Sequence, residues 1–418
     1  MRNKSFAGQK STVAQTLLLA LAIFLSAVNA HAGEKVVFQF NQNQGFNPSN
    51  GLISDSAGDF YGTASGGIGI CSNVYELSPG SNGTYTETVL YTFQNCNRTG
   101  LYPTGALSID KNGNLYGAEY GFSTADGSGL VYELTKQTNG TFTYSVLHNF
   151  GAEEGGPFGD FAWDSAGNMY GATSHDSTTF NGEVFEMSPQ SNGTWKDTVL
   201  YQFPSPNGVG SPAGSVVLDG QGNLYGATFF GYGGYGTSTR GGVYELSPQI
   251  GTRWKLTLLY NFTTASTSQF PNSRLTFDSS GNLYGTTQSG NTFYGTVFEV
   301  SAGSGGTWTE KTLHSFNSGN NDGGSTTGNL VFDASGNLYG VTYDGGSGCN
   351  QNLCGVVYKL TPQSGGGYTE SIVHPFESAG DGSGPYSGLF LDSSGNLYGT
   401  TYHGGSRYGY GTVYQITP

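Results

Sequence analysis

The residues that could carry chemistry lie just after a Tyr-Gly pair that recurs along the chain, at positions where single copies depart from the common residue. The second residue after the pair is Thr in five copies, but Ala64 in the first copy and Glu119 in the second. The candidates at and beside this position are Glu119, Tyr120, His175, Phe229, Tyr343, Asp344, Tyr402 and His403. Aromatic faces of this kind bind sugars or peptides, and a carboxylate with a His can supply an acid and a base.

These candidates are compatible with more than one function. Our main interpretation is a binding or interaction module that holds a glycan, a peptide or a protein on one loop face. The alternative is an extracellular polysaccharide lyase or hydrolase that uses Glu119 with His175 or His403, and a further alternative is a structural cell-surface protein. The sequence contains no nucleophile motif, metal-binding His-Glu pattern or phosphate loop, so we assign no catalytic residue and expect no cofactor and no metal ion.

The elements that must position these candidates form seven repeats of about 55 residues. Each copy contains Gly-Asn-Leu-Tyr-Gly or a close variant, with an Asp three residues before it. The first Gly of these segments is Gly58, Gly113, Gly167, Gly222, Gly281, Gly336 and Gly395. Four apolar segments per repeat, joined by turn residues, predict four strands, A to D. His148, His314 and His374 share one strand D position with Tyr, and we interpret them as packing residues with a polar tip.

Seven four-stranded units predict an all-β fold, a seven-bladed β-propeller. The main rival is a solenoid, and the two ends of the chain decide between them. The last repeat stops after strand C, at residues 413–418, whereas a strand D stands alone at residues 36–40. Sharing one repeat between the ends closes a ring and removes two sheet edges, which a solenoid has no reason to do. We therefore expect residues 36–40 to complete blade seven, and the D–A and B–C loops that carry the candidates to share one face.

One repeat pattern, Pro-x-x-x-Leu…Asp-x-x-Gly-Asn-Leu-Tyr-Gly-Thr-Thr…Gly-Gly…Gly-Thr-Val-Tyr-Glu, is clearest in the last three copies. It resembles the Gly- and Tyr-rich tandem repeats known as GloVer repeats, which are found in exported bacterial proteins. The resemblance covers essentially the whole chain after residue 32 and implies an extracellular setting. It brings no activity and no catalytic residue to any position of this sequence.

Residues 1–32 predict a secretory signal peptide. Three cations precede an apolar run over residues 17–28, which is too short to span a bilayer, and residues 30–32 fit a cleavage site. Residues 33–418 are then expected to form one propeller domain, a monomer that is extracellular or periplasmic and does not insert into the membrane. The formal charge of −14 disfavours nucleic acid as a partner, because a surface this acidic repels phosphate groups.

Four Cys in an exported protein predict two disulfides. Cys71 opens strand C of blade one and Cys96 follows strand D of the same blade, so a C–D hairpin brings the two within reach. Cys349 and Cys354 bracket a short loop before strand C of blade six. We therefore expect the pairs Cys71–Cys96 and Cys349–Cys354. A zinc site is disfavoured because the 349–354 loop contains no His.

Overall fold

The structure is a computed structural model, and its described part contains strands and turns only. It describes residues 33–41, 47–66, 71–81, 83–93, 101–121, 129–151, 154–174, 182–203, 211–229, 239–251, 253–290, 294–317, 322–346, 354–377, 380–405 and 409–418. The expected signal peptide lies outside the described residues. The segment Ala32–Pro418 makes one compact unit. Within the described ranges, no helix has the length and apolar character needed to cross a membrane.

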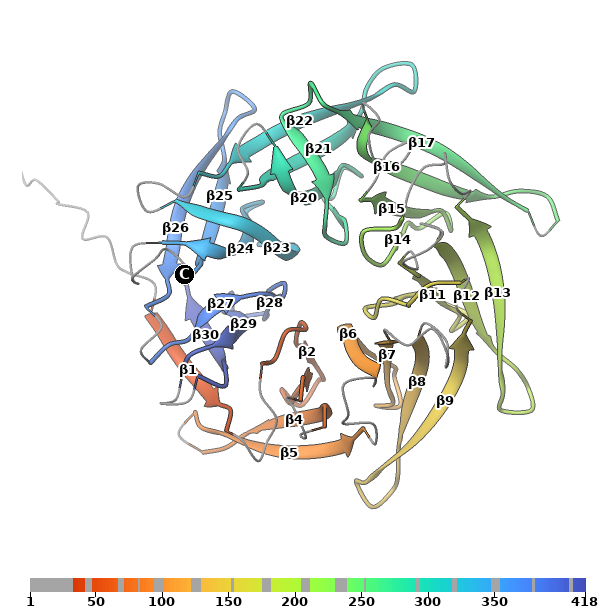
Figure 1. The fold of residues 1–418 in the computed structure, drawn as a ribbon, viewed down its shortest axis with the longest axis vertical. Coiled ribbons are helices and arrows are strands. Elements are labelled where there is room, and N and C mark those ends of the chain that lie inside the picture. The colour runs from red at the N-terminus through yellow and green to blue at the C-terminus, as the bar shows by residue number, and fades with distance from the viewer. Residues whose placement is uncertain are drawn as a thin grey trace, which may run out of the picture. The chain divides into compact units, whose positions relative to one another are not determined.

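The strands form seven antiparallel sheets, which are the blades of a ring (Figure 1). Blade one contains β2 (Ile53–Ser54), β3 (Phe60–Ala64), β4 (Asn73–Pro79) and β5 (Tyr85–Thr92), and blade two contains β6 (Leu101–Ile109), β7 (Leu115–Gly121), β8 (Gly129–Lys136) and β9 (Phe142–Phe150). Blade three contains β10 (Ala162–Trp163), β11 (Met169–Ala172), β12 (Glu183–Pro189) and β13 (Trp195–Gln202), and blade four contains β14 (Val217–Leu218), β15 (Leu224–Thr228), β16 (Thr239–Pro248) and β17 (Trp254–Thr263).

The remaining three blades follow the same order. Blade five contains β18 (Ser268–Pro271), β19 (Thr276–Phe277), β20 (Leu283–Gly290), β21 (Thr296–Ala302) and β22 (Trp308–Ser315). Blade six contains β23 (Gly323–Phe332), β24 (Leu338–Gly345), β25 (Val356–Pro362) and β26 (Tyr368–Pro375). Blade seven contains β27 (Ser383–Pro385), β28 (Phe390–Leu391), β29 (Leu397–His403), β30 (Thr412–Thr417) and β1 (Gly33–Gln39). In blades five and seven the innermost strand is split into two short pieces that pair with the same neighbour.

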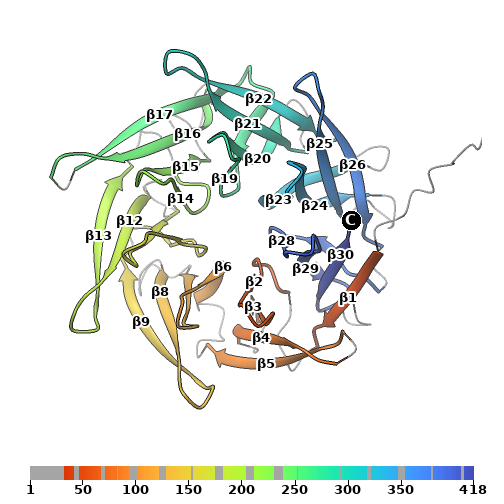
Figure 2. The same ribbon diagram turned by 180° about the vertical axis from the view of Figure 1, so that it is seen from behind.

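The ring is closed by the first strand of the described chain. β1 pairs antiparallel with β30, from Gly33 opposite Thr417 to Gln39 opposite Thr412. The reverse view shows β1 as the outer strand of blade seven, beside blade one (Figure 2). The predicted seven-bladed propeller with a shared last blade is therefore confirmed.

The repeated Gly of the Tyr-Gly pair is required by the packing of strand B against an aromatic residue of strand C. A Cβ atom added to Gly340 would lie 2.3 Å from Tyr358 Oη and 2.8 Å from Leu330 Cδ2. The same collision is found between Gly399 and Tyr414 Oη, at 2.3 Å. Because both Tyr residues are fully buried, the Gly leaves the space that the ring occupies in the core.

The repeated Asp caps the A–B turn. In blade five, Asp278 Oδ1 accepts hydrogen bonds from the backbone N–H groups of Ser280 and Asn282, and Asp278 Oδ2 accepts from the Asn282 side chain. Burial alone would raise the pKa of Asp278, but these hydrogen bonds outweigh it and lower the pKa. The turn also places Gly281 at φ 84°, a conformation that favours Gly.

Candidate functional site

A cavity of about 930 Å³ lies at the centre of the ring, because its wall contains the innermost residues of all seven blades. The third residue after the repeated Pro, or after Thr326 in blade six, belongs to this wall in every blade. These residues are Gly51, Ala106, Asp160, Ser215, Arg274, Asn329 and Gly388. Neighbouring members are in close contact, since a Cβ added to Gly388 would lie 3.0 Å from the Asn329 Cβ. Four of the seven are small, and the other three are large and polar.

The three large members meet inside the cavity although they come from blades three, five and six. Arg274 Nη1 lies 3.3 Å from Asp160 Oδ2, and Asn329 Nδ2 donates to the same oxygen at 2.9 Å. Arg274 Nε also donates to the backbone carbonyl of Val216 at 3.3 Å. Asp160 has φ 66°, which is unusual outside Gly. The side chains of Arg274 and Asp160 are 28% and 22% exposed, so the ion pair is accessible to a ligand in the cavity.

A cluster of aromatic rings lies beside the cavity, between blades six and seven. Tyr386 lines the cavity and is 50% exposed. Its ring centroid lies 5.8 Å from that of Tyr343 and 6.4 Å from that of Tyr402. Tyr402 in turn contacts His403, at 4.6 Å between centroids and at a nearly perpendicular angle. We call Tyr343, Tyr386, Tyr402 and His403 the rim cluster.

The rim cluster brings together three of the residues expected from the sequence, Tyr343, Tyr402 and His403. Tyr386 was not expected, although its position carries a signal. It follows the repeated Pro, where most other blades have smaller residues such as Ser49, Thr104 and Ala213, and blade three has the less exposed Phe158. The exposure of the Tyr386 ring is therefore a local departure from the repeat.

The environment of the rim cluster shifts two ionisable groups. Burial lowers the pKa of His403 below its ordinary value of 6.5. Burial first, and then the nearby Asp344, raise the pKa of Tyr343. Asp344 itself accepts a hydrogen bond from Ser325 Oγ at 2.7 Å, while its Oδ1 is buried and has no hydrogen-bond partner among the described residues. Because burial lowers its pKa, His403 is neutral at neutral pH and can accept a proton.

Glu119 lies elsewhere, at the interface between blades one and two. It is 4% exposed and accepts a hydrogen bond from Tyr144 Oη at 3.0 Å. The Tyr144 ring stacks on Tyr91 of blade one, with centroids 4.4 Å apart and planes at 2°. Burial raises the pKa of Glu119 to about 7, although the hydrogen bond from Tyr144 lowers it. Glu119 is not part of the cavity wall, and the structure does not bring it into the rim cluster.

The other expected residues are not part of the rim cluster. Phe229 contacts Phe270, with ring centroids 5.4 Å apart, and the Arg240 guanidinium lies 5.5 Å from the Phe270 centroid. Tyr120 lies in β7 and is half-buried. His175 lies outside the described residues. Among the described side chains, one further group could hold a metal ion, namely His314, Asp322 and Glu370.

Cys71 and Cys354 are each disulfide-bonded, and no free Cys is found in the described part of the chain. Cys96 and Cys349 lie outside the described residues. The expected pairs Cys71–Cys96 and Cys349–Cys354 therefore stay a prediction.

Comparisons with known proteins identify a family and a fold. A family model described as the Gloeobacter/Verrucomicrobia repeat matches residues 157–414. A search of curated proteins finds no match. Among solved structures, an ulvan lyase of a new polysaccharide lyase family superposes with a TM-score of 0.57 and 14% identity, covering 92% of this chain and 96% of that chain. A second structure of such an ulvan lyase, bound to -[GlcA(1-4)Rha3S]-, gives 0.56 and 14%, with the same coverage. The polysaccharide lyase Uly1 gives 0.50 and 12%, covering 92% of both chains.

These comparisons correct our main interpretation of the sequence. We expected a binding or interaction module, and this expectation is wrong, because the solved propellers that superpose on the chain with a TM-score of 0.50 or more are described as polysaccharide lyases. At 12–14% identity the likeness itself establishes the fold alone. The residues of the central cavity and the rim cluster must therefore carry the argument for the enzymatic alternative.

Proposed function

The chain belongs to the Gloeobacter/Verrucomicrobia repeat family, and we propose that it is an extracellular polysaccharide lyase whose active site lies where the rim cluster meets the central cavity. One observation carries this proposal. Tyr386 lines the cavity that contains Arg274, and it also contacts Tyr343 and Tyr402 of the rim cluster. A sugar chain bound on these rings would reach a cavity that holds a guanidinium group.

These side chains match the chemistry of β-elimination beside a uronate carboxylate. The C5–H bond breaks as a base takes the proton, and its electron pair forms the C4–C5 double bond. The C4–O bond then breaks as the leaving oxygen takes a proton from an acid. Arg274 is suited to stabilise the negative charge that builds up on the carboxylate. His403 is suited to act as the base because its lowered pKa keeps it neutral, and the adjacent Tyr402 hydroxyl is suited to act as the acid.

A lyase is favoured over a hydrolase because few carboxylates lie near the proposed active site. Glycoside hydrolases use two carboxyl groups that flank the scissile bond. Among the described residues that line the cavity, Asp160 is the one carboxylate, and Arg274 and Asn329 already bind it. Glu119 is buried beside Tyr144 and is not part of the cavity wall. Asp344, beside Tyr343 of the rim cluster, is then a single carboxylate near the site, where a hydrolase needs two.

The substrate class follows from the cation in the cavity. Arg274 favours a sugar that carries a carboxylate. The solved ulvan lyase of the same fold is bound to -[GlcA(1-4)Rha3S]-, which contains a uronate. We therefore propose a uronate-containing polysaccharide as the substrate.

The proposed activity agrees with an extracellular setting. The expected signal peptide over residues 1–32 would export the chain, and the expected disulfides Cys71–Cys96 and Cys349–Cys354 would form outside the cytoplasm. A protein sent to this compartment encounters polymeric glycans that do not enter the cell.

The test is incubation of the mature protein with a panel of uronate-containing polysaccharides. Product is followed by the ultraviolet absorbance of the new double bond and, in parallel, by reducing ends. We expect both signals to rise together with at least one polymer and to be lost in Arg274→Gln, while the exposed-surface variant Arg253→Gln keeps full activity. Reducing ends without the absorbance would show hydrolysis and overturn the lyase assignment. No cleavage of any polymer on the panel would contradict the enzymatic proposal.

A further inference from the structure

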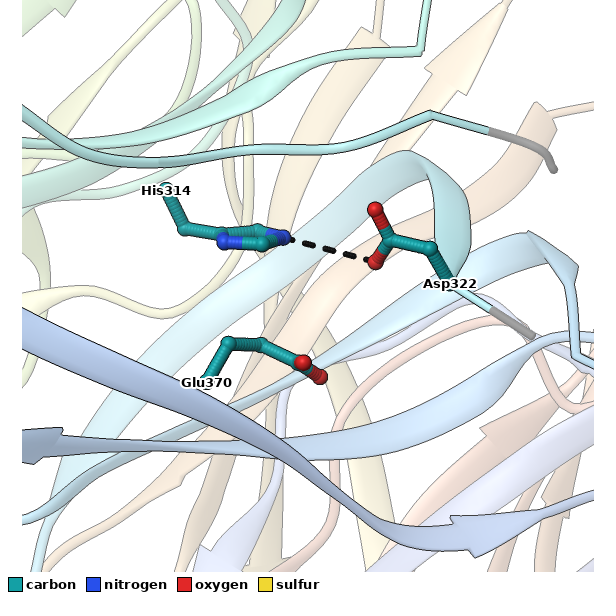
Figure 3. Close-up of side chains that lie close together, drawn as sticks. All are labelled: His314, Asp322 and Glu370. Carbon is teal, nitrogen blue, oxygen red and sulfur yellow. Dashed lines mark hydrogen bonds and ion pairs between the residues drawn. The ribbon is translucent and has the colours of Figure 1, made fainter. Parts of the chain in front are cut away.

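Three ionisable side chains meet at the interface between blades five and six. His314 comes from the outer strand β22 of blade five, Glu370 comes from the outer strand β26 of blade six, and Asp322 immediately precedes β23. One ligand atom of each lies within 4.8 Å of the others. Figure 3 shows the Glu370 carboxylate below the gap between the His314 ring and the Asp322 carboxylate. None of the three lines the central cavity.

We propose that His314, Asp322 and Glu370 bind one divalent transition-metal ion, with Zn²⁺ as the best match. One imidazole nitrogen and two carboxylate oxygens form a ligand set that Zn²⁺ accepts, with water completing the coordination. Ca²⁺ and Mg²⁺ prefer oxygen ligands alone, so the imidazole selects against them. The ion would join the outer strands of two neighbouring blades.

Two of the ligands are held in place by contacts with backbone N–H groups and with an aromatic ring. Asp322 Oδ2 accepts the Asn317 backbone N–H at 2.9 Å, and Oδ1 accepts the Gly323 backbone N–H at 2.9 Å. The His314 ring packs edge-to-face on Phe316, with centroids 4.6 Å apart. His314 Nε2 lies 3.4 Å from Asp322 Oδ1, which is long for a hydrogen bond. Supporting contacts of this kind orient metal ligands in proteins.

Glu370 supplies the second argument, through comparison with the same position of the neighbouring blade. In blade five this position is Glu310, whose Oε1 accepts hydrogen bonds from Ser268 at 2.8 Å and from Thr312 at 3.0 Å. Glu370 Oε1 is buried and has no hydrogen-bond partner among the described residues. A buried carboxylate oxygen without a donor is costly, and a bound cation would remove that cost.

The charges of the cluster point the same way. Glu370 interacts electrostatically with both His314 and Asp322. Two carboxylates and one imidazole thus lie within 4.8 Å of one another. A divalent cation neutralises both carboxylates, whereas protonation of His314 neutralises one.

The arrangement recurs at the next interface, between blades six and seven. His374 Nε2 lies 3.2 Å from Asp381 Oδ2, and Glu34 of β1 interacts electrostatically with both residues. Glu34 Oε1 is likewise buried without a hydrogen-bond partner in the described part of the chain. By contrast, blade four has Leu256 at the position of Glu370, and Leu256 packs in an apolar cluster with Tyr201 of blade three. An acid thus accompanies the His at all three interfaces that carry it, since Asp197 of blade three also interacts with His148 of blade two.

The experiment is a metal titration of the full mature protein after treatment with a chelator. Calorimetry with Zn²⁺, Mg²⁺ and Ca²⁺ gives affinity and stoichiometry, and thermal unfolding with and without Zn²⁺ reports stabilisation. Glu370→Gln removes a proposed ligand charge, and Glu310→Gln is the matched control at the same position of blade five. Asp322→Asn is the second ligand variant, and circular dichroism shows that each variant is folded before titration.

We expect saturable Zn²⁺ binding, a higher Tm with Zn²⁺, and little response to Mg²⁺ or Ca²⁺. Glu370→Gln and Asp322→Asn should each weaken one Zn²⁺ site by at least about tenfold, whereas Glu310→Gln should bind as wild type does. A second ion that survives in Glu370→Gln and is lost in His374→Gln would belong to the interface of blades six and seven. Absence of saturable Zn²⁺ binding, or equal affinity in Glu370→Gln, Asp322→Asn and wild type, would overturn the proposal. Activity on polysaccharides plays no part in this readout, so it fails or succeeds independently of the proposed lyase.

Discussion

Arg274 of blade five forms an ion pair with Asp160 of blade three, with Nη1 and Oδ2 3.3 Å apart in the central cavity. Blade four separates these two blades, so the ion pair forms across the central cavity, where the inner ends of all blades lie close together. Ion pairs of this exposure contribute little to stability, typically below about 1 kcal/mol. The pair therefore presents a cation to the cavity more than it holds the ring together.

This relationship leads to the first prediction. Arg274→Gln should abolish most cleavage of a uronate polymer and lower the free energy of unfolding by about 1 kcal/mol or less. Steady-state kinetics and urea unfolding of the same preparation measure the two effects. A variant that unfolds at much lower urea would show that Arg274 is structural, and a fully active variant would remove it from the active site.

A pH profile tests the role of His403. Because burial lowers its pKa below 6.5, His403 gains its proton only at a pH below this value. If it is the base, kcat/KM should rise with pH through this lowered pKa and be level at neutral pH. His403→Gln should reduce kcat/KM and eliminate this acidic limb. An unchanged limb in the variant would assign the base to another residue.

Much of the fold could be predicted because the repeat constrains it. Gly340 and Tyr358 belong to segments that recur in every blade. Their close contact explains why Gly is found at this position of each repeat. The pairing of β1 with β30 was predictable because the last repeat has no strand D of its own. Because the chain contains seven copies of the repeat, a residue that the fold requires can be recognised by its recurrence within this one sequence.

The site was less predictable for geometric reasons. Tyr343 and Tyr402 hold the same repeat position in neighbouring blades, so their proximity could be anticipated. Arg274 and Asp160 also share a repeat position, but their blades are not adjacent, and only the narrow centre of the ring brings them together.

The proposed metal ligands were also hard to predict from the sequence, because they come from different blades. His314 and Glu370 lie on the outer strands of different blades, 56 residues apart in the numbering of the chain. At the sequence level His314 was interpreted as a packing residue, and no metal ion was expected. Its partners become visible only where two blades pack against each other.

Glu119 should make stability depend on pH. The pKa of Glu119 is raised by burial from 4.5 to about 7, so between these values the folded state keeps a proton that the unfolded state has lost. Its stabilising contribution is complete below pH 4.5 and is lost as pH rises through 7, by about 3 kcal/mol at most. Glu119→Gln should therefore be less sensitive to pH than wild type when urea unfolding is compared at pH 5 and pH 8. The exposed Glu377→Gln is the control, and an equal pH slope in Glu119→Gln would contradict the assigned burial.

Gly340→Ala tests the strand B packing. The added Cβ would collide with Tyr358 Oη, and overpacking of this kind costs about 1–3 kcal/mol. Tyr358→Phe should recover only a small part of that cost, because it removes Oη but leaves Cζ 2.6 Å from the added Cβ, as close as the 2.5 Å between Phe185 Cζ and a Cβ added to Gly171 in blade three. A double-mutant cycle in urea measures the coupling. Additive effects of the two substitutions would show that the strands separate rather than collide.

Tyr386 lies between the cavity and the rim cluster. Its replacement should change substrate binding without changing the stability of the fold. Half of the side chain is exposed, so Tyr386→Ala should leave the Tm nearly unchanged. Loss of a ring that stacks on a sugar costs on the order of 1 kcal/mol, which corresponds to a several-fold to tenfold rise in KM for the polymer. Tyr386→Phe keeps the ring and should keep KM near the wild-type value. A lower kcat in Tyr386→Phe would instead identify the hydroxyl as the proton donor and transfer that role from Tyr402. Wild-type kinetics in Tyr386→Ala would place the sugar away from the rim cluster altogether.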